Sequence, residues 1–130
     1  MPSAYVLAPL RRGKPIHTIL GRSRCASFVH VDDCARALAH LMRHGTGGEP
    51  YFIVDDEPLA WVEFYGRAAA AMGVDYRLRR IPVPLLRAAV GPVIAESLLS
   101  ESVLSNQKLR ASGFSLAYPT TSSGIRAVVA

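Results

Sequence analysis

The residue types best suited to acid–base chemistry lie together in the segment Phe28-Val29-His30-Val31-Asp32-Asp33. A histidine and two carboxylates can exchange protons when their surroundings shift their pKa values toward neutrality. Each also has a structural interpretation. A histidine at the end of a strand usually packs, and an aspartate before a helix accepts hydrogen bonds from its free N–H groups. We favour packing for His30 and the roles of cap and fold anchor for Asp32 and Asp33, and the sequence assigns no catalytic residue.

Two arginines form a second candidate group. Arg22 and Arg24 lie in a basic turn, and a guanidinium fork matches the geometry of a phosphate. The alternative is a solvated loop in a basic chain with a formal net charge of +5. Aromatic residues do not alternate with the basic ones, and no nucleic-acid motif occurs, so we do not expect an RNA or DNA partner.

Metal chemistry is not expected. The two cysteines, Cys25 and Cys34, form no Cys-x-x-Cys pair and have no histidine at a ligand spacing. We expect Cys34 to be a buried reduced thiol.

At 130 residues, half of them apolar, the chain is expected to form one domain with a modest core. The apolar residues from Ala4 to Leu10 are too few to span a membrane, and they lack the order of a signal peptide. We therefore expect a cytoplasmic protein with no membrane partner.

Hydrophobic periodicity predicts alternating strands and helices, hence an α/β chain. Strands are predicted at 16–20, 27–31, 51–54 and 76–81. Helices are predicted at 4–12, from Asp32 or Asp33 (as the N-cap) to 44, at 60–72 with Gly73 as its C-terminal stop, at 84–99 with a break at Gly91-Pro92, at 105–111 with Ser105 as cap, and at 122–129, started by Thr120 or Thr121.

Two of these helices have clear apolar faces. Cys34, Leu38, Leu41 and Met42 share one face of the first, with Ala35 and Ala39 beside them. The other helix carries a stripe of Val62, Tyr65, Ala69 and Met72. Ala60 stands where a capping hydroxyl would be favoured, so a side-chain cap is expected to be missing there.

Several short segments together resemble a known family. They are Phe28 to Asp33, Gly48 to Pro58 (GEPYFIVDDEP), Trp61 to Phe64, Arg79 to Pro84, and Leu104 to Arg110 followed by Gly113-Phe114 and Tyr118-Pro119. In order and separation they resemble the C-terminal half of an extended short-chain dehydrogenase/reductase of the NAD-dependent epimerase/dehydratase family, closest to its 3β-hydroxysteroid dehydrogenase-like branch. The resemblance implies the C-terminal portion of an NAD(P)-binding Rossmann-type fold, with short parallel strands and helices and the nucleotide-binding half absent. Residues 1–130 would then be a single substrate-binding domain.

The family's cofactor and catalytic motifs are missing from these 130 residues. A dinucleotide site needs a glycine-rich turn between a strand and a helix, whereas Gly45-Thr46-Gly47-Gly48 precedes a strand-like run. The family's catalytic Tyr-x-x-x-Lys is also missing, because neither Lys14 nor Lys108 has a tyrosine four residues earlier. We therefore expect no NAD(P) bound by this chain alone, and no hydride transfer without another part.

The resemblance implies that substrate-binding residues lie in the first motif and just before it: Arg22, Arg24, Phe28 and His30. In nucleotide-sugar members a second arginine precedes the helix predicted at 105–111. Ser102, Val103 and Leu104 stand there instead, which favours a less anionic small-molecule substrate.

Three hypotheses follow. In the first, the chain is the substrate-binding part of a split or truncated reductase or epimerase, and a separate Rossmann-half subunit or a missing segment supplies NAD(P). It would then expose an apolar surface where that half packs. In the second, it is a stand-alone protein, a cofactor-free cyclase or isomerase or a small-molecule binder, that forms a homo-oligomer. In the third, it is an inert fragment, which should behave as a molten chain.

Overall fold

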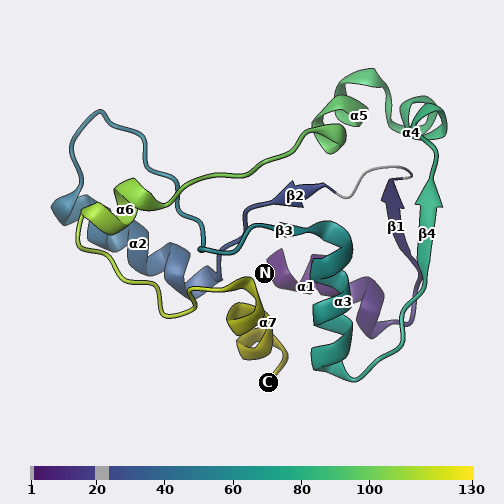
Figure 1. The fold of residues 1–130 in the computed structure, drawn as a ribbon, viewed down its shortest axis with the longest axis horizontal. Coiled ribbons are helices and arrows are strands. Elements are labelled where there is room, and N and C mark those ends of the chain that lie inside the picture. The colour runs from purple at the N-terminus through teal and green to yellow at the C-terminus, as the bar shows by residue number, and fades with distance from the viewer. Residues whose placement is uncertain (1, 20–23) are drawn as a thin grey trace.

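The computed structural model describes residues 2–19 and 24–130, and within them helices and short strands alternate (Figure 1). The helices are α1 (Pro2–Arg11), α2 (Val31–His44), α3 (Trp61–Met72), α4 (Val83–Val90), α5 (Pro92–Leu99), α6 (Gln107–Ala111) and α7 (Thr121–Val129). The strands are β1 (Ile16–Ile19), β2 (Cys25–Ala26), β3 (Leu59–Ala60) and β4 (Leu78–Ile81). The predicted α/β class with short parallel strands is confirmed.

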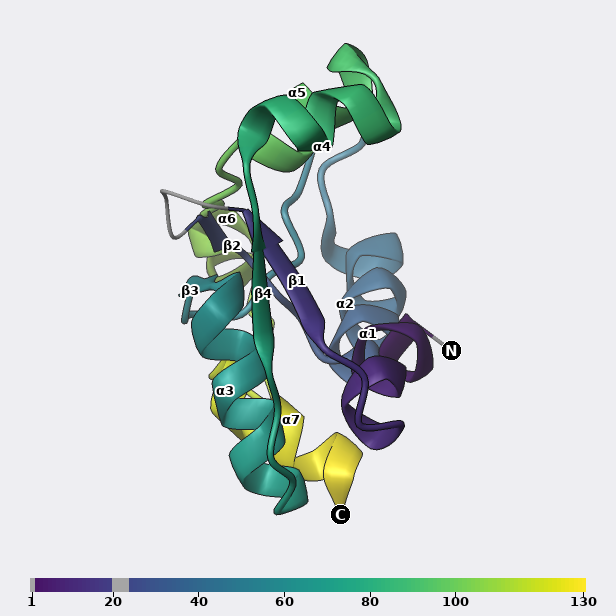
Figure 2. The same ribbon diagram turned by 90° about the vertical axis from the view of Figure 1, so that its right-hand side faces the viewer.

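β1 and β4 form a parallel pair, with Ile16 opposite Leu78 and Ile19 opposite Ile81. Helices α1, α3 and α7 lie beside this pair (Figure 2). Their apolar faces share one core, built around the buried residues Leu7, Leu10, Ile16, Ala68, Ala69 and Ile125. Tyr65 and Met72 pack against it, so most of the stripe predicted on α3 is buried.

Two predicted strands do not form. Residues 27–30 are an extended loop, and residues 51–54 form no strand. Isolated hydrogen bonds, rather than a strand ladder, bind the backbone of these segments. The Asp55 N–H donates to the Phe28 carbonyl (2.7 Å), and the Asn106 side-chain amide donates to the Val54 carbonyl (3.0 Å). A strand needs a ladder of such bonds, and an apolar run cannot show whether a partner strand stands beside it.

The second strand pair, β2 with β3, is antiparallel and involves residues for which no strand was predicted. Cys25 lies opposite Ala60 and Ala26 opposite Leu59, and Ala26 also forms an isolated bridge with Ser102. This pairing brings the start of α3 next to the segment that leads into α2.

Most helix boundaries follow the predicted signals. Thr120 begins α7 with a capping box, in which it and Ser123 exchange side-chain to backbone hydrogen bonds. Gly73 ends α3 in the left-handed region (φ 64°), where a side chain would be strained, and Ala60 makes no side-chain cap. The break between α4 and α5 falls at Gly91, as predicted.

Two predicted caps are wrong. His30, rather than Asp32 or Asp33, is the N-cap of α2, because its side chain accepts the Asp32 N–H. The helix therefore begins two residues earlier than a carboxylate cap would place it. At α6 the N-cap is Asn106 rather than Ser105, although the Gln107 N–H still donates to the Ser105 hydroxyl at 3.3 Å.

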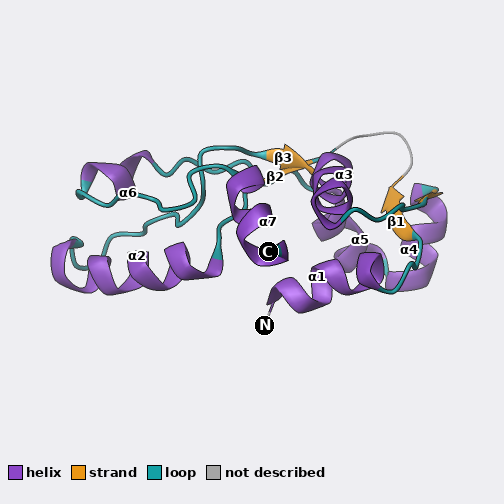
Figure 3. Cartoon of the chain, turned by 90° about the horizontal axis from the view of Figure 1, so that it is seen from below, coloured by secondary structure: helices purple, strands orange, loops and turns teal. Residues whose placement is uncertain are grey.

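Helices α4 and α5 form a small hairpin at one end of the molecule, while α2 and α6 lie at the other end (Figures 1 and 3). The hairpin has its own core of Leu86, Ala95 and Leu99. None of the described helices is long and apolar enough to cross a membrane.

α2 buries only part of the face predicted for it. Its buried side chains are Asp33 and Ala37, and Leu41, from the predicted face, packs with Ala37 against Leu109. The rest of that face is largely open, since Leu38 and Met42 are 55% and 89% exposed. Periodicity identified an apolar surface, but no described element covers the part around Leu38 and Met42.

Candidate ligand cavity between α2, α3 and α7

A cavity of about 360 Å³ opens between the segment before α2, the start of α3 and the side of α7. That volume lies in the range of small-molecule sites. Most of its wall is apolar. The lining residues are Leu7, Phe28, Val29, His30, Val31, Cys34, Asp55, Trp61, Phe64, Thr120, Thr121, Gly124, Ile125 and Val128.

Aromatic rings form one wall. Phe28 stacks on Phe64 with ring centroids 4.6 Å apart and planes 9° from parallel. Trp61 meets the edge of Phe28 at 5.0 Å in a T-shaped contact. These rings come from two segments that the β2–β3 pair holds together, and they give a rigid surface suited to a flat apolar molecule.

His30 is also part of the cavity wall. Its Nδ1 accepts the Asp32 N–H at 3.2 Å, and its ring packs against Tyr118 with centroids 4.0 Å apart. The side chain is only 8% exposed. Gly124 of α7 lies beside the ring, and a Cβ added there would be in ordinary van der Waals contact, 3.6 Å from the His30 Cβ and Cδ2. Cap and packing together fix the orientation of the imidazole.

Asp55 is the buried carboxyl group of the cavity wall, with 4% of the residue exposed. Its Oδ1 accepts the Glu57 N–H at 3.0 Å, and the Thr121 hydroxyl donates to its Oδ2 at 2.6 Å. Burial raises the pKa of Asp55, an effect that these two hydrogen bonds oppose. The carboxyl therefore keeps its proton to a higher pH than an exposed aspartate.

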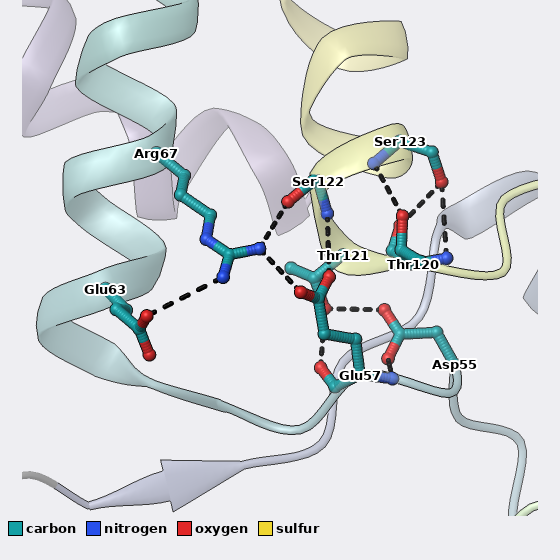
Figure 4. A network of polar contacts seen from close by, with 8 residues as sticks. All are labelled: Asp55, Glu57, Glu63, Arg67, Thr120, Thr121, Ser122 and Ser123. Atoms are coloured by element: carbon teal, nitrogen blue, oxygen red, sulfur yellow. Dashed lines mark hydrogen bonds and ion pairs between the residues drawn. The ribbon is translucent and has the colours of Figure 1, made fainter.

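A polar network beside Asp55 fixes the start of α7 (Figure 4). The Arg67 guanidinium of α3 donates to Glu57 Oε1 at 2.6 Å and to the Ser122 hydroxyl at 2.5 Å, and Glu63 lies 3.6 Å from it. Because Glu57 belongs to the loop after Asp55, the network joins that loop to both helices. It holds two walls of the cavity in place.

Asp33 anchors the chain on the other side of His30. Its carboxylate is fully buried and accepts hydrogen bonds from the Ala117 and Tyr118 N–H groups, at 2.9 and 2.7 Å. Arg36 pairs with it at 2.6 Å. Every one of these contacts is structural, in agreement with the predicted role of fold anchor. The bonds hold Tyr118 where it supports the His30 ring.

The four predicted substrate-binding residues lie in different places. Phe28 and His30 are on the cavity wall, and their contact with a substrate stays a prediction. Arg24 is half-buried before β2, and its carbonyl accepts the Trp61 N–H (3.1 Å), but it does not line the cavity. Arg22 lies outside the described residues.

Several wall residues were not predicted. Asp55, Trp61 and Thr121 were not among the candidate site residues. Their proximity arises from α7 folding back on the loop after residue 54, which no local pattern reveals. Cys34 lines the cavity and is a free thiol, half-buried rather than fully buried.

No metal site is evident in this part of the chain. Within residues 2–19 and 24–130, no three histidine, cysteine, aspartate or glutamate side chains gather closely enough to hold an ion. The described walls also contain no glycine-rich turn at a helix start that could cradle a pyrophosphate.

No protein-family model matches the sequence, and no curated protein matches it. Solved structures share its fold, among them the two described next. Human epimerase family protein SDR39U1 (isoform 2), solved with NADPH, superimposes with a TM-score of 0.80 and 20% identity. The match covers 97% of this chain and 42% of that chain. A functionally unknown conserved protein from Silicibacter pomeroyi DSS gives a TM-score of 0.72 and 24% identity, over 88% of this chain and 41% of that one.

The chain thus spans about two fifths of the length of these two structures. It has the fold of part of an epimerase-family protein. At the level of fold, this confirms the expectation of a portion of an extended short-chain dehydrogenase/reductase.

Proposed function

We propose that this chain is the substrate-binding portion of an NAD(P)-dependent epimerase/dehydratase or reductase-like protein. The observation that carries the proposal is the largely apolar cavity of about 360 Å³, whose wall includes Phe28 and His30 from the motif expected to contact substrate. Residues 1–130 would act as one binding domain, and the redox chemistry would require a nucleotide-binding part that these residues do not contain.

The wall indicates a compact, uncharged ligand. Phe28, Trp61 and Phe64 supply aromatic surface, and no arginine or lysine is among the described lining residues. A nucleotide diphosphate would place two charged phosphates against a surface with no cation to pair with them, which is unfavourable. The substrate class that fits is a small ring system with few polar groups.

The open face of α2 supports the need for a further part. Val31, Leu38 and Met42 are all more than half exposed on this helix, although each is apolar. The SDR39U1 structure, which was solved with NADPH, extends well beyond the part that this chain matches. We propose that a nucleotide-binding half, in the same polypeptide or a separate one, covers this face and carries the NAD(P). A homo-oligomer covering the same face is the alternative, and it would make the chain a cofactor-free binding protein, cyclase or isomerase.

Trp61 allows a direct test of ligand binding, because it is the only tryptophan and lines the cavity. We would titrate the chain with 2-decalone, an uncharged bicyclic ketone, and with uridine diphosphate, and follow Trp61 emission. The ketone should change the emission at concentrations where the nucleotide does not.

Two leucine variants locate the binding. Gly124→Leu should fill the cavity from α7 and weaken ketone binding by about tenfold or more, since the ligand and the new side chain compete for the same space. Ala88→Leu adds the same side chain on the exposed surface of α4 and should leave binding unchanged. Tighter binding of the nucleotide, or equal ketone binding by all three proteins, would contradict the proposal.

A further inference from the structure

His30 is a wall residue whose hydrogen-bonding capacity is not used up. Among the described residues, its Nδ1 accepts the Asp32 N–H, while its Nε2 has no hydrogen-bond partner. The side chain is only 8% exposed, yet Nε2 is not one of the fully buried atoms that lack a partner, so this nitrogen can still be reached by water or by a ligand in the cavity whose wall it belongs to.

The cap of α2 determines which imidazole nitrogen carries the proton. A backbone N–H donates to Nδ1, so Nδ1 must present its lone pair. In a neutral imidazole the proton then resides on Nε2, which becomes a donor. The Asp32 carboxylate is 3.7 Å from Nδ1, outside hydrogen-bond distance, and does not take over the cap.

Asp55 and Thr121 are already engaged, because Asp55 accepts from the Glu57 N–H and from the Thr121 hydroxyl. The Thr120 oxygen accepts the Ser123 N–H, which leaves its hydroxyl proton open, and no described residue accepts from the Trp61 indole N–H. Cys34 offers only a thiol, which is a weak donor. The imidazole is therefore, with Thr120 and Trp61, one of the donors on the described wall still open to a ligand, and unlike that of Trp61 its side chain is almost fully buried.

We propose that His30 Nε2–H donates a hydrogen bond to an acceptor oxygen, such as a ketone carbonyl, on an uncharged and largely apolar ligand held against Phe28 and Trp61. This inference rests on the proposed ligand-binding function and adds the chemical group that is recognised. The cap of α2 then also sets ligand specificity. Because the hydrogen bond from the Asp32 N–H keeps the proton on Nε2, the site favours ligands with an acceptor and disfavours ligands whose polar group can only donate.

The tautomer can be tested without any ligand. In a chain labelled with ¹⁵N-histidine, ring-nitrogen NMR spectra at neutral pH should show His30 with an unprotonated Nδ1 and a protonated Nε2. His17, which is exposed on β1, is an internal comparison. A His30 signal with the proton on Nδ1 would overturn the inference.

Recognition of the acceptor can be tested with 1-tetralone and tetralin, which share a ring system and differ in the carbonyl. Amide NMR shifts at Gly124 and Cys34 report binding in the cavity. We expect the preference for tetralone over tetralin to fall by about fivefold in His30→Phe, because one neutral hydrogen bond is lost. His30→Asn keeps an acceptor for the cap but is too short to replace Nε2, and it should show the same fall.

The outcomes separate this inference from the proposed function. If both compounds shift the cavity amides and their relative affinity is unchanged in both variants, the cavity binds ligands but His30 is not the donor. If neither compound shifts those amides in the wild-type chain, the inference and the proposed binding function both fail.

Discussion

Helices α2 and α3 were both predicted with a clear apolar face, yet only α3 buries most of that face. Tyr65, Ala69 and Met72 of α3 pack into the core shared with α1 and α7. Leu38 and Met42 of α2 remain exposed, and that helix is held through Asp33, Ala37 and Leu41. The apolar face of α3 is packed against other parts of this chain. On α2 the apolar surface around Leu38 and Met42 is covered by no described element.

The difference shows that periodicity predicts an apolar surface but not its partner. For α3 the partners are local in the fold, because α7 packs directly on it. For α2 the polar anchor of Asp33 fixes the helix position, so its remaining apolar residues are available to another part of the protein. The following predictions test this division, in decreasing order of expected effect.

Loss of the Asp33 anchor should have the largest effect. Asp33→Ala leaves the Ala117 and Tyr118 N–H groups and the Arg36 guanidinium without their shared, fully buried acceptor. We expect the free energy of unfolding to fall by about 4 kcal/mol, measured by urea denaturation. Asp32→Ala, at an exposed neighbouring carboxylate, is the matched control and should change it by less than about 0.5 kcal/mol. Equal effects of the two would show that α2 is not held through its buried carboxylate.

Truncation of the α6 side chain that packs against α2 should have a clear but smaller effect on stability. Leu109 is fully buried beneath this helix with Ala37 and Leu41, and Leu109→Ala should cost about 3 kcal/mol through lost burial and the cavity left behind. Leu38→Ala removes the same atoms from the exposed face and should cost about 0.5 kcal/mol or less. Thermal and urea denaturation of both variants would decide, and a large loss for Leu38→Ala would mean that this face is covered.

Ionisation of Asp55, which is hydrogen-bonded to Thr121 of α7, should make the stability of the chain depend on pH. Burial raises its pKa in the folded chain above the ordinary value of 3.8, so the folded state retains a proton that the unfolded state has released. Its contribution to stability is therefore complete below about pH 4 and is lost as the pH rises through the folded-state pKa.

Asp55→Asn tests this assignment. The amide can accept from the Glu57 N–H and donate to the Thr121 oxygen, so it imitates the protonated carboxyl. We expect the decline of stability above pH 4 to become shallower in this variant, as followed by urea denaturation at several pH values. A decline as steep as that of the wild type would assign it to another group.

A charge introduced on the open face of α2 should have the smallest effect on the stability of the chain. Met42→Glu should change the free energy of unfolding by less than about 0.5 kcal/mol, because the side chain is 89% exposed. The same change should abolish association with a part that covers this face, since a carboxylate would be buried there without a partner. Unchanged association, measured by co-purification, would remove α2 from the interface.

Much of the fold followed from local signals. Alternation predicted β1, the stripe of Tyr65 and Ala69 predicted α3, and Gly73 and Thr120 marked helix ends. The strands expected at 27–31 and 51–54 failed because strand formation depends on a neighbour that local sequence does not specify. The cap of α2 was missed because histidine is not a preferred N-cap, although its Nδ1 can accept a backbone N–H.

The site was less predictable than the fold. Phe28 and His30 came from a motif, whereas Asp55, Trp61 and Thr121 reach the same cavity through long-range contacts. The hydroxyl of Thr121 bonds to Asp55 across 66 positions of the chain, a relation that only the folded structure reveals.

Native mass spectrometry of the endogenously tagged protein, purified from its source cells, tests the central claim most directly. We predict that the 130 residues travel with a nucleotide-binding part that contains a glycine-rich loop, as a separate chain or in one longer polypeptide. For a separate chain, Met42→Glu should abolish the association and Ala88→Glu, on the exposed surface of α4, should not. A mass equal to the chain alone, or to a homo-oligomer of it, would contradict the account.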